Sequence, residues 1–405
     1  MPASPNAGRY PWVVCFTSLF LVFFGQGAMF VLNVELKPIA EDMGWPRELP
    51  SLGYTSAFLG AGIGALYFGP LSERLGMGNV ALIGALSIGS GTFLAGYVET
   101  PGQLMLVFGV LIGLLGNACM FAPLMAHVMR WFDRNRGLAL GIATAGQSVG
   151  GAIWPSIITW LDGTVGWRDT FHIYGLLCFA IMVPLTMLLR RPAPSAASAS
   201  PRNATPDGRA FGLPGGVATA VLCAAIVGCC IPMSIPLVHL KAYGTDLGLA
   251  PQAAAAALSM ALFASLTSRI LGGMLADRIG GLKTLLIGSV IQCAMLAVIS
   301  QAREMWTLYA ACIVFGLGYG GIIGMYAYLV REYFPPAGAT RRIAWIFLFG
   351  TIGMAAGGWL GGRLFDATGS YETAFLAGSA INTVQLAIVV TLLIRVRPAA
   401  RLAAA

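Results

Sequence analysis

Long apolar stretches recur along almost the whole chain and are separated by short polar loops. A helix needs about 20 apolar residues to cross a hydrocarbon core of about 30 Å, and twelve stretches meet this requirement. We therefore predict an all-α polytopic membrane protein with twelve transmembrane helices. The predicted spans are Trp12–Val34, Leu52–Leu71, Val80–Val98, Leu104–Met129, Leu138–Leu161, Thr170–Leu189, Leu213–Leu240, Ala253–Leu275, Leu282–Ser300, Met305–Val330, Ile343–Leu364 and Thr373–Ile394.

Composition agrees with this pattern. Apolar residues make up 57% of the 405 residues and charged residues 10%, against roughly 45–50% and 25% in soluble domains. The first apolar stretch is too long for a signal peptide and lacks a small-residue cleavage site. The eight cysteines all fall inside predicted spans, where they behave as small apolar residues, so we expect no disulfide frame, metal site or cofactor.

The distribution of charge predicts the orientation. The loops on the side of the N-terminus hold 17 basic and 5 acidic residues. Because basic loops stay in the cytoplasm, both termini are predicted to be cytoplasmic. The net charge of +8 then lies beside the inner leaflet of the bilayer and requires no nucleic-acid partner.

The chain is predicted to divide in the middle. Residues 190–212 include a stretch rich in Pro, Ser and Ala, typical of a flexible linker, between a six-helix half at residues 1–189 and another at 213–405. The pattern G-x-L-x-[DE]-R-x-G follows the second span at Gly69–Gly76 and the eighth at Gly273–Gly280. This repetition indicates two halves that arose by internal duplication.

One arginine stands apart from the other charges. Arg269 is the only charged residue between Pro251 and Ala276, in the middle of the eighth predicted span. An arginine at that depth costs at least ~2.5 kcal/mol on insertion scales, so it persists only where it faces a watery cavity or a partner. We therefore predict an anion site at Arg269.

The twelve spans, the central loop and the duplicated motif resemble the major facilitator superfamily, whose members are built from repeats. Three further stretches resemble bacterial monocarboxylate transporters: Arg130–Gly141, Pro236–Leu240 ahead of Asp246–Gly248, and Ser268–Arg278. The resemblance implies a monomeric secondary active transporter in the bacterial inner membrane, with no enzymatic activity. It implies a small organic anion as substrate, above all a monocarboxylate, moved by rocker-switch alternating access. The family's arginine on the eighth helix falls on Arg269.

The sequence departs from that family at one position. Proton-coupled monocarboxylate transporters often place an aspartate one turn before this arginine, and here the position is Ser265. No carboxylate lies in the middle of another predicted span, so the sequence supports anion transport better than proton symport. The stretch Thr351–Gly357 carries no second cation, which favours a singly charged substrate.

Polar side chains on the predicted spans are candidates for substrate contacts. In the resembled fold the first, fourth, seventh and tenth helices line a central cavity. Asn117, Met120, Leu124 and His127 share one stripe of the fourth span, because steps of three and four return to the same side of a helix; interhelical hydrogen bonding is the alternative role of such polar groups. The expected substrate-binding residues are Arg269, Asn33, Asn117, Met120, Gln147, Tyr319 and Tyr326.

Two histidines are candidates for proton coupling. His127 lies near the inner end of the fourth span and His239 near the outer end of the seventh. A histidine pKa near 6.5 suits a proton switch, and structural hydrogen bonding is the alternative role. The proton could also travel on the substrate.

The duplicated loops are candidate gates. Glu73 and Arg74 occupy the first copy, and Asp277 and Arg278 the second. An acidic side chain at a helix end can accept hydrogen bonds from a neighbouring helix N-terminus, which would hold one conformation closed. Small-xxx-small ridges of glycine on the second, fifth and eleventh spans let helices approach closely, and we expect some of them to serve contacts between the halves.

Three classes of function are compatible with the sequence. The first is a transporter of a small organic anion, either coupled to protons or exchanging anions without them. The second is an efflux pump for lipophilic compounds, although cationic drugs favour a buried acid over a buried base. The third is a membrane sensor or intramembrane enzyme, for which the spans hold neither an H-E-x-x-H pair nor a G-x-S-x-G elbow. Uptake into proteoliposomes separates the three.

Overall fold

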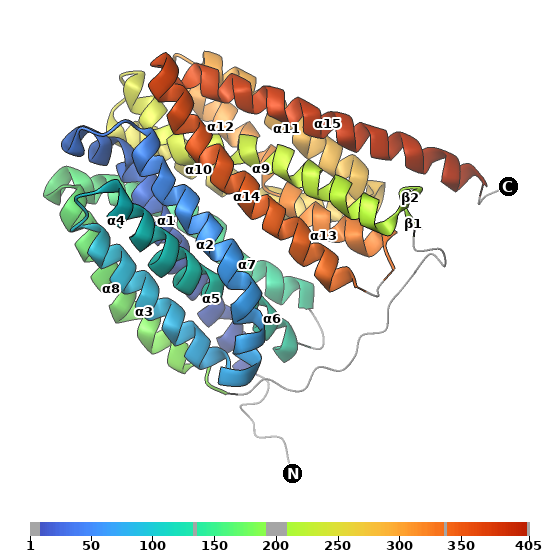
Figure 1. Ribbon diagram of the computed structural model, residues 1–405, viewed down its shortest axis with the longest axis horizontal. Coiled ribbons are helices and arrows are strands. Elements are labelled where there is room, and N and C mark those ends of the chain that lie inside the picture. Colours follow the sequence, from blue (N-terminus) through green and yellow to red (C-terminus); the bar gives the residue numbers. More distant parts are fainter. Residues whose placement is uncertain (1–8, 133–135, 192–208, 336–337, 403–405) are drawn as a thin grey trace, which may run out of the picture. The chain divides into compact units, whose positions relative to one another are not determined.

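The computed structural model describes residues 9–132, 136–191, 209–335 and 338–402, and almost all of them are helical (Figure 1). Most of the predicted linker, residues 192–208, lies outside the described residues. After it, Arg209–Ala210 (β1) pairs antiparallel with Leu213–Pro214 (β2) in a short hairpin that leads into the second half.

All twelve predicted spans are helical apart from short breaks and a few residues at their ends. In the first half the helices are α1 (Tyr10–Met43), α2 (Glu48–Leu75), α3 (Met77–Ala95), α4 (Pro101–Leu106), the π-helix η1 (Val107–Asn117), α5 (Ala118–Met120), α6 (Ala122–Trp131), α7 (Arg136–Val165) and α8 (Trp167–Met187). In the second half they are α9 (Gly215–Asp246), α10 (Pro251–Ile279), α11 (Gly281–Gln301), α12 (Met305–Tyr319), α13 (Ile322–Tyr333), α14 (Ala339–Thr368) and α15 (Tyr371–Leu402).

The lengths and composition of these helices make the protein an all-α, multi-pass membrane protein. Ten helical segments of the described chain are long and apolar enough to cross a bilayer, with the α4–α6 and α12–α13 series each forming one segment. The other two predicted spans correspond to α2 and α7, with 28 and 30 residues. Both are longer than the roughly 20 residues that a bilayer requires.

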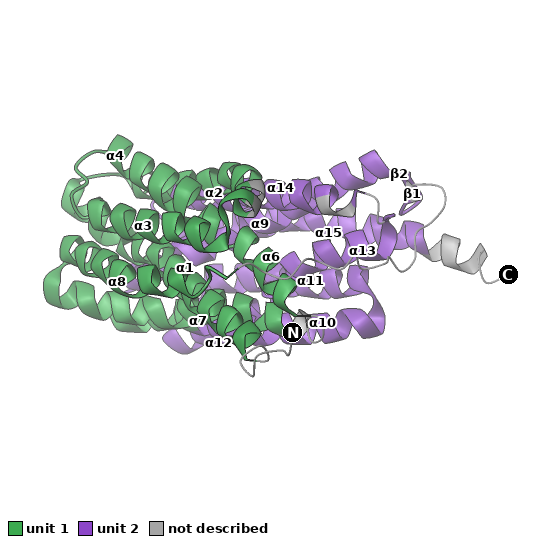
Figure 2. Cartoon of the chain, turned by 90° about the horizontal axis from the view of Figure 1, so that it is seen from below, with its two compact units in different colours: residues 1–197, 250–259 green, residues 198–249, 260–405 purple. Residues whose placement is uncertain are grey.

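Two compact units make up the chain (Figure 2): residues 1–197 with 250–259, and residues 198–249 with 260–405. Within unit 1, α1 packs along α7, α3 along α8, and α2 along η1. Within unit 2, α9 packs along α14 and α11 along α15. The α1–α7 and α3–α8 pairs of the first half thus correspond to the α9–α14 and α11–α15 pairs of the second, as internal duplication predicts.

The final glycine of the duplicated motif has the same structural role in both halves. Gly76 precedes α3 with φ 79°, and Gly280 precedes α11 with φ 88°. A side chain is disfavoured at such positive φ, whereas glycine adopts it at little cost. The motif therefore builds a sharp reversal between the second and third helices of each half.

The glycine ridges serve tight packing inside the units. A methyl group added at Gly60 would overlap the carbonyl oxygen of Gly109 on η1. A methyl group at Gly146 would overlap the carbonyl oxygen of Leu19 on α1, and a methyl group at Gly357 would overlap the carbonyl oxygen of Ile231 on α9. In each case the partner helix belongs to the same half. These positions thus serve backbone packing within one half, and the expected contacts between the halves stay a prediction.

Alanine at Gly316 is expected to destabilise the protein by about 1–3 kcal/mol, the usual effect of overpacking. Its methyl group would overlap the Ala261 carbonyl oxygen of α10 and approach the Ala264 side chain within 2.8 Å. The matched control is Gly324→Ala on α13, where a methyl group meets nothing within 4 Å. Thermal unfolding in detergent should show a lower midpoint only for Gly316→Ala, and equal midpoints would contradict the packing argument.

Candidate functional site

Arg269 lies on α10 with Ser265 one turn before it. The Arg269 side chain is partly exposed, while its Nε atom is enclosed. The Tyr319 hydroxyl at the end of α12 interacts with both Ser265 and the Arg269 guanidinium. The structure therefore brings together two of the predicted residues, Arg269 and Tyr319, and adds Ser265. A guanidinium beside a phenol and a hydroxyl offers several donors to an anion.

The helix break between α12 and α13 is fastened to α10 next to the arginine. The Ser268 hydroxyl donates to Leu317 O at 2.6 Å and accepts from Gly321 N at 3.2 Å. A methyl group at Gly320 would overlap the Ser265 carbonyl oxygen, so the two backbones touch here. Ser268 thus satisfies backbone groups that the break leaves open and fixes Tyr319 relative to Arg269.

Two other arginines have structural roles at helix ends. Arg303, in the loop after α11, forms an ion pair with Glu372 at the start of α15, and this hydrogen bond raises the pKa of its guanidinium. Arg168 donates to Gly96 O at 3.1 Å and lies 3.7 Å from Asp42. Arg269 differs from both because it lies in the middle of an apolar helix.

Tyr326 does not share the surroundings of Tyr319. The two lie seven residues apart, but the break at Gly320 and Gly321 separates their helices. The Tyr326 side chain is fully buried, and its hydroxyl faces Gln385 of α15 and Cys229 of α9. Equal spacing along the sequence thus does not give the two tyrosines a common environment.

The predicted stripe of the fourth span is interrupted in the structure. Eleven residues form the π-helix η1, which ends at Asn117, and Phe121 separates α5 from α6. Met120 packs against Gly84 of α3, because a methyl group added at Gly84 would lie only 2.9 Å from the Met120 methyl group. The Asn117 side chain approaches Gly25 of α1. A π-helix shifts the register of side chains, which the assumption of α-helical spacing did not allow for.

Two of the predicted polar groups lie on α1 and α7. Gln147 Nε2 donates to Gln26 Oε1 at 3.4 Å, which links α7 to α1. Asn33 lies two turns further along α1 and is buried. These amides are polar groups inside unit 1, and their contact with the substrate stays a prediction.

Both candidate histidines take part in structural hydrogen bonds. His127 Nε2 accepts from Trp131 Nε1 at 3.0 Å, so this nitrogen carries no proton. His239 Nε2 lies 2.8 Å from Gly358 O and Nδ1 lies 3.2 Å from the Tyr371 hydroxyl. Since a carbonyl oxygen only accepts, His239 Nε2 must donate.

The gating candidates have unequal surroundings. Asp277 is exposed and accepts from the Tyr328 hydroxyl of α13 at 3.5 Å, while Glu332 accepts from Gly281 N at the start of α11. Glu332 thus binds a helix N-terminus within unit 2, and the gating role of Asp277 stays a prediction. The other gating candidates are Arg74 and Arg278, both exposed, and Glu73, whose side chain lies outside the described residues.

Two charged residues are buried in helices where the sequence analysis had predicted loops. The first span continues nine residues past Val34 to the end of α1, and it includes Glu35, which is 0% exposed. The seventh span continues past Leu240 and includes Lys241, which is 3% exposed. The predicted boundaries had placed both residues in loops, because the charges themselves were taken as span ends. Each charge lies in a helix that continues beyond it.

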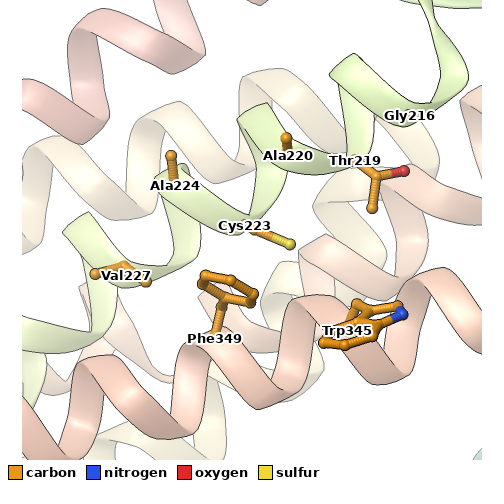
Figure 3. A pocket seen from close by; sticks show the side chains of 8 residues that line it. All are labelled: Gly216, Thr219, Ala220, Cys223, Ala224, Val227, Trp345 and Phe349. Atoms are coloured by element: carbon orange, nitrogen blue, oxygen red, sulfur yellow. The ribbon is translucent and has the colours of Figure 1, made fainter.

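A groove of about 540 Å³ runs between α9 and α14 (Figure 3). Its lining is almost wholly apolar, with Cys223, Phe349 and Trp345 directed into it. The Thr219 hydroxyl group in the lining donates a hydrogen bond to Gly215 O of the same helix, α9. Without a charged side chain this groove does not suit an anion. The described residues contain no group of side chains able to hold a metal ion.

Comparison with known proteins decides the family. The family model of the Major Facilitator Superfamily matches residues 15–215 and 220–404. The chain belongs to the Major Facilitator Superfamily. It resembles Monocarboxylate transporter 13 of Rattus norvegicus, with 26% identity over 96% of this chain and 90% of the relative. Monocarboxylate transporter 3 of the same organism is 29% identical, over 94% and 79% respectively.

The chain is also similar to a fungal transporter that is not named as a monocarboxylate transporter. MFS-type transporter pynF of Aspergillus niger is 26% identical over 75% of this chain and 69% of its own length. All these relatives are named as transporters and none as an enzyme. The superfamily member described here is therefore a transporter of a small molecule.

Solved structures share the fold. A bacterial homologue of the human lysosomal transporter Spinster, in an inward-facing and unoccupied conformation, has a TM-score of 0.69 at 14% identity and covers 97% of this chain and 96% of its own. A mutant of the nucleoside transporter NupG has a TM-score of 0.70 at 15% identity, with 95% and 99% covered. At such identities the likeness extends to the fold alone.

Proposed function

We propose that this superfamily member carries a small organic anion, above all a monocarboxylate, by alternating access. The observation that carries the proposal is the position of Arg269, a guanidinium in the middle of an apolar helix beside the Tyr319 hydroxyl. A guanidinium presents parallel donors that match the two oxygens of a carboxylate. Similarity to proteins named monocarboxylate transporters supports the same substrate class.

The candidate site around Arg269 is described with one fixed cation, which favours a substrate with one negative charge. Thr351–Gly357 on α14 supplies no second basic group, so a dicarboxylate would bring one uncompensated charge into a region of low dielectric constant. Such a charge is costly unless it is paired. We place the protein in a bacterial inner membrane with both termini in the cytoplasm, because the basic loops lie on the side of the termini.

The test is uptake into proteoliposomes with purified protein. A radiolabelled short monocarboxylate such as lactate should accumulate inside, and an excess of unlabelled monocarboxylate should compete. The matched amide of the same acid should not compete, because it has the same shape without the charge. If the protein moves lipophilic compounds and ignores carboxylates, the proposal is wrong and the efflux alternative holds.

The coupling is a separate question from the substrate. His127 and His239 remain candidates, although both already hold structural hydrogen bonds. We add Glu35, because an ionisable residue buried in a transmembrane helix is a functional candidate. Anion exchange without protons predicts that uptake depends on an internal anion and is indifferent to a pH gradient.

A further inference from the structure

A second polar cluster lies in unit 2, with surroundings different from those of Arg269. Its five side chains come from α11, α13 and α15, and all are 0% exposed. We name them together the inner polar cluster: Ser289, Gln292, Tyr326, Asn382 and Gln385.

Hydrogen bonds join part of this cluster to the surrounding helices. Gln292 Nε2 donates to Cys229 O of α9 and to Asn382 Oδ1, both at 3.0 Å. Asn382 Nδ2 donates to Ser289 O at 2.9 Å. These bonds hold α11 against α9 and α15, and they locate Gln292 and Asn382 side by side.

Five other atoms of the cluster are enclosed and make no hydrogen bond of normal geometry, although the Tyr326 hydroxyl lies near enough to Gln385 and Cys229 to interact with both. Ser289 precedes Gln292 by one helical turn, and Asn382 precedes Gln385 by one turn, so Ser289 and Gln385 each lie one turn from a member of the bonded pair. Tyr326 approaches from α13, where its hydroxyl faces Gln385 and Cys229. The five atoms are Ser289 Oγ, Gln292 Oε1, Tyr326 Oη, Gln385 Nε2 and Gln385 Oε1.

Such a concentration of unsatisfied groups is unusual in a folded protein. Nearly all buried polar atoms have a partner, and those that lack a protein partner commonly bind ordered water. A buried water makes about three hydrogen bonds, so about two waters suffice for five atoms. The set contains donors and acceptors together, as water requires. Complete burial of all five side chains excludes larger ligands that would need an open path.

We propose that the inner polar cluster encloses ordered water molecules that bridge Tyr326 on α13 and Gln385 on α15 to Gln292 and Ser289 on α11. The proposal concerns the interior of unit 2 and does not depend on which substrate is carried.

The direct test is X-ray radiolytic labelling of the reconstituted protein in ¹⁸O-water, which modifies buried side chains only where water lies beside them. Tyr326 should be labelled several-fold faster than Tyr174. Tyr174 is the matched control, because it is also buried and its hydroxyl donates to Phe24 O at 2.8 Å, so it needs no water. Labelling of Tyr326 as slow as that of Tyr174 would overturn the proposal.

A second measurement uses the sign of a stability change. Tyr326→Phe removes one partner from the enclosed water, so the thermal unfolding midpoint should fall. If the cluster were dry, the same variant would delete an unsatisfied hydroxyl and the midpoint would rise. A rise would therefore also overturn the proposal. The labelling experiment uses the unmodified protein, so it decides the matter even if the variant does not fold.

Discussion

Uptake of the transported carboxylate is expected to cease in Arg269→Ala and to persist weakly in Arg269→Lys. Loss of a charged hydrogen bond costs ~1.5–3 kcal/mol, so lysine should weaken binding roughly 10- to 150-fold. A compact ammonium cannot present the two parallel donors of a guanidinium. Binding of a short monocarboxylate to purified protein, measured by calorimetry or thermal shift, gives the affinity, and proteoliposomes give the rate.

The matched control for this experiment is Arg331→Ala. Arg331 is an exposed arginine at the end of α13 in the same unit, and its removal should leave binding unchanged. A structural role of Arg269 would appear as lost expression or a lower unfolding midpoint. A well-folded Arg269→Ala protein that bound its carboxylate with unchanged affinity would refute the anion site.

The second large effect is expected at Glu35. If this carboxyl group carries the coupled proton, Glu35→Gln should abolish accumulation driven by a pH gradient and preserve exchange of substrate across the membrane at equal pH. Glutamine keeps the shape of the side chain and cannot release a proton. Substrate counterflow and gradient-driven uptake, measured in the same proteoliposomes, separate the two outcomes.

Glu41→Gln supplies the control for this variant. Glu41 belongs to the same helix, its side chain is 65% exposed, and it lies 3.8 Å from Lys37. Its replacement should leave both forms of transport intact. Gradient-driven accumulation that survives in Glu35→Gln would exclude this residue as the proton carrier. It would leave the histidines or the substrate itself in that role.

The positions of individual side chains were harder to predict than the helices. The spacing of Asn117 and Met120 assumed regular α-helix, whereas η1 and the break at Phe121 change the register. Tyr319 and Tyr326 looked equivalent for the same reason, and only Tyr319 lies against Arg269. Helix irregularities depend on how glycine and proline are accommodated by neighbouring helices, which local periodicity does not encode.

The sequence by itself determined the helical membrane architecture, the repeat and the isolated charge at Arg269. These follow from local quantities: the length of each apolar stretch, the repeated loop motif, and the cost of one cation among apolar residues. The tertiary structure alone decided that α1 continues past Glu35, that Ser265 and Tyr319 join Arg269, and that Tyr326 belongs to the inner polar cluster. Those outcomes depend on which helices touch, and such contacts are set by packing between segments far apart in the chain.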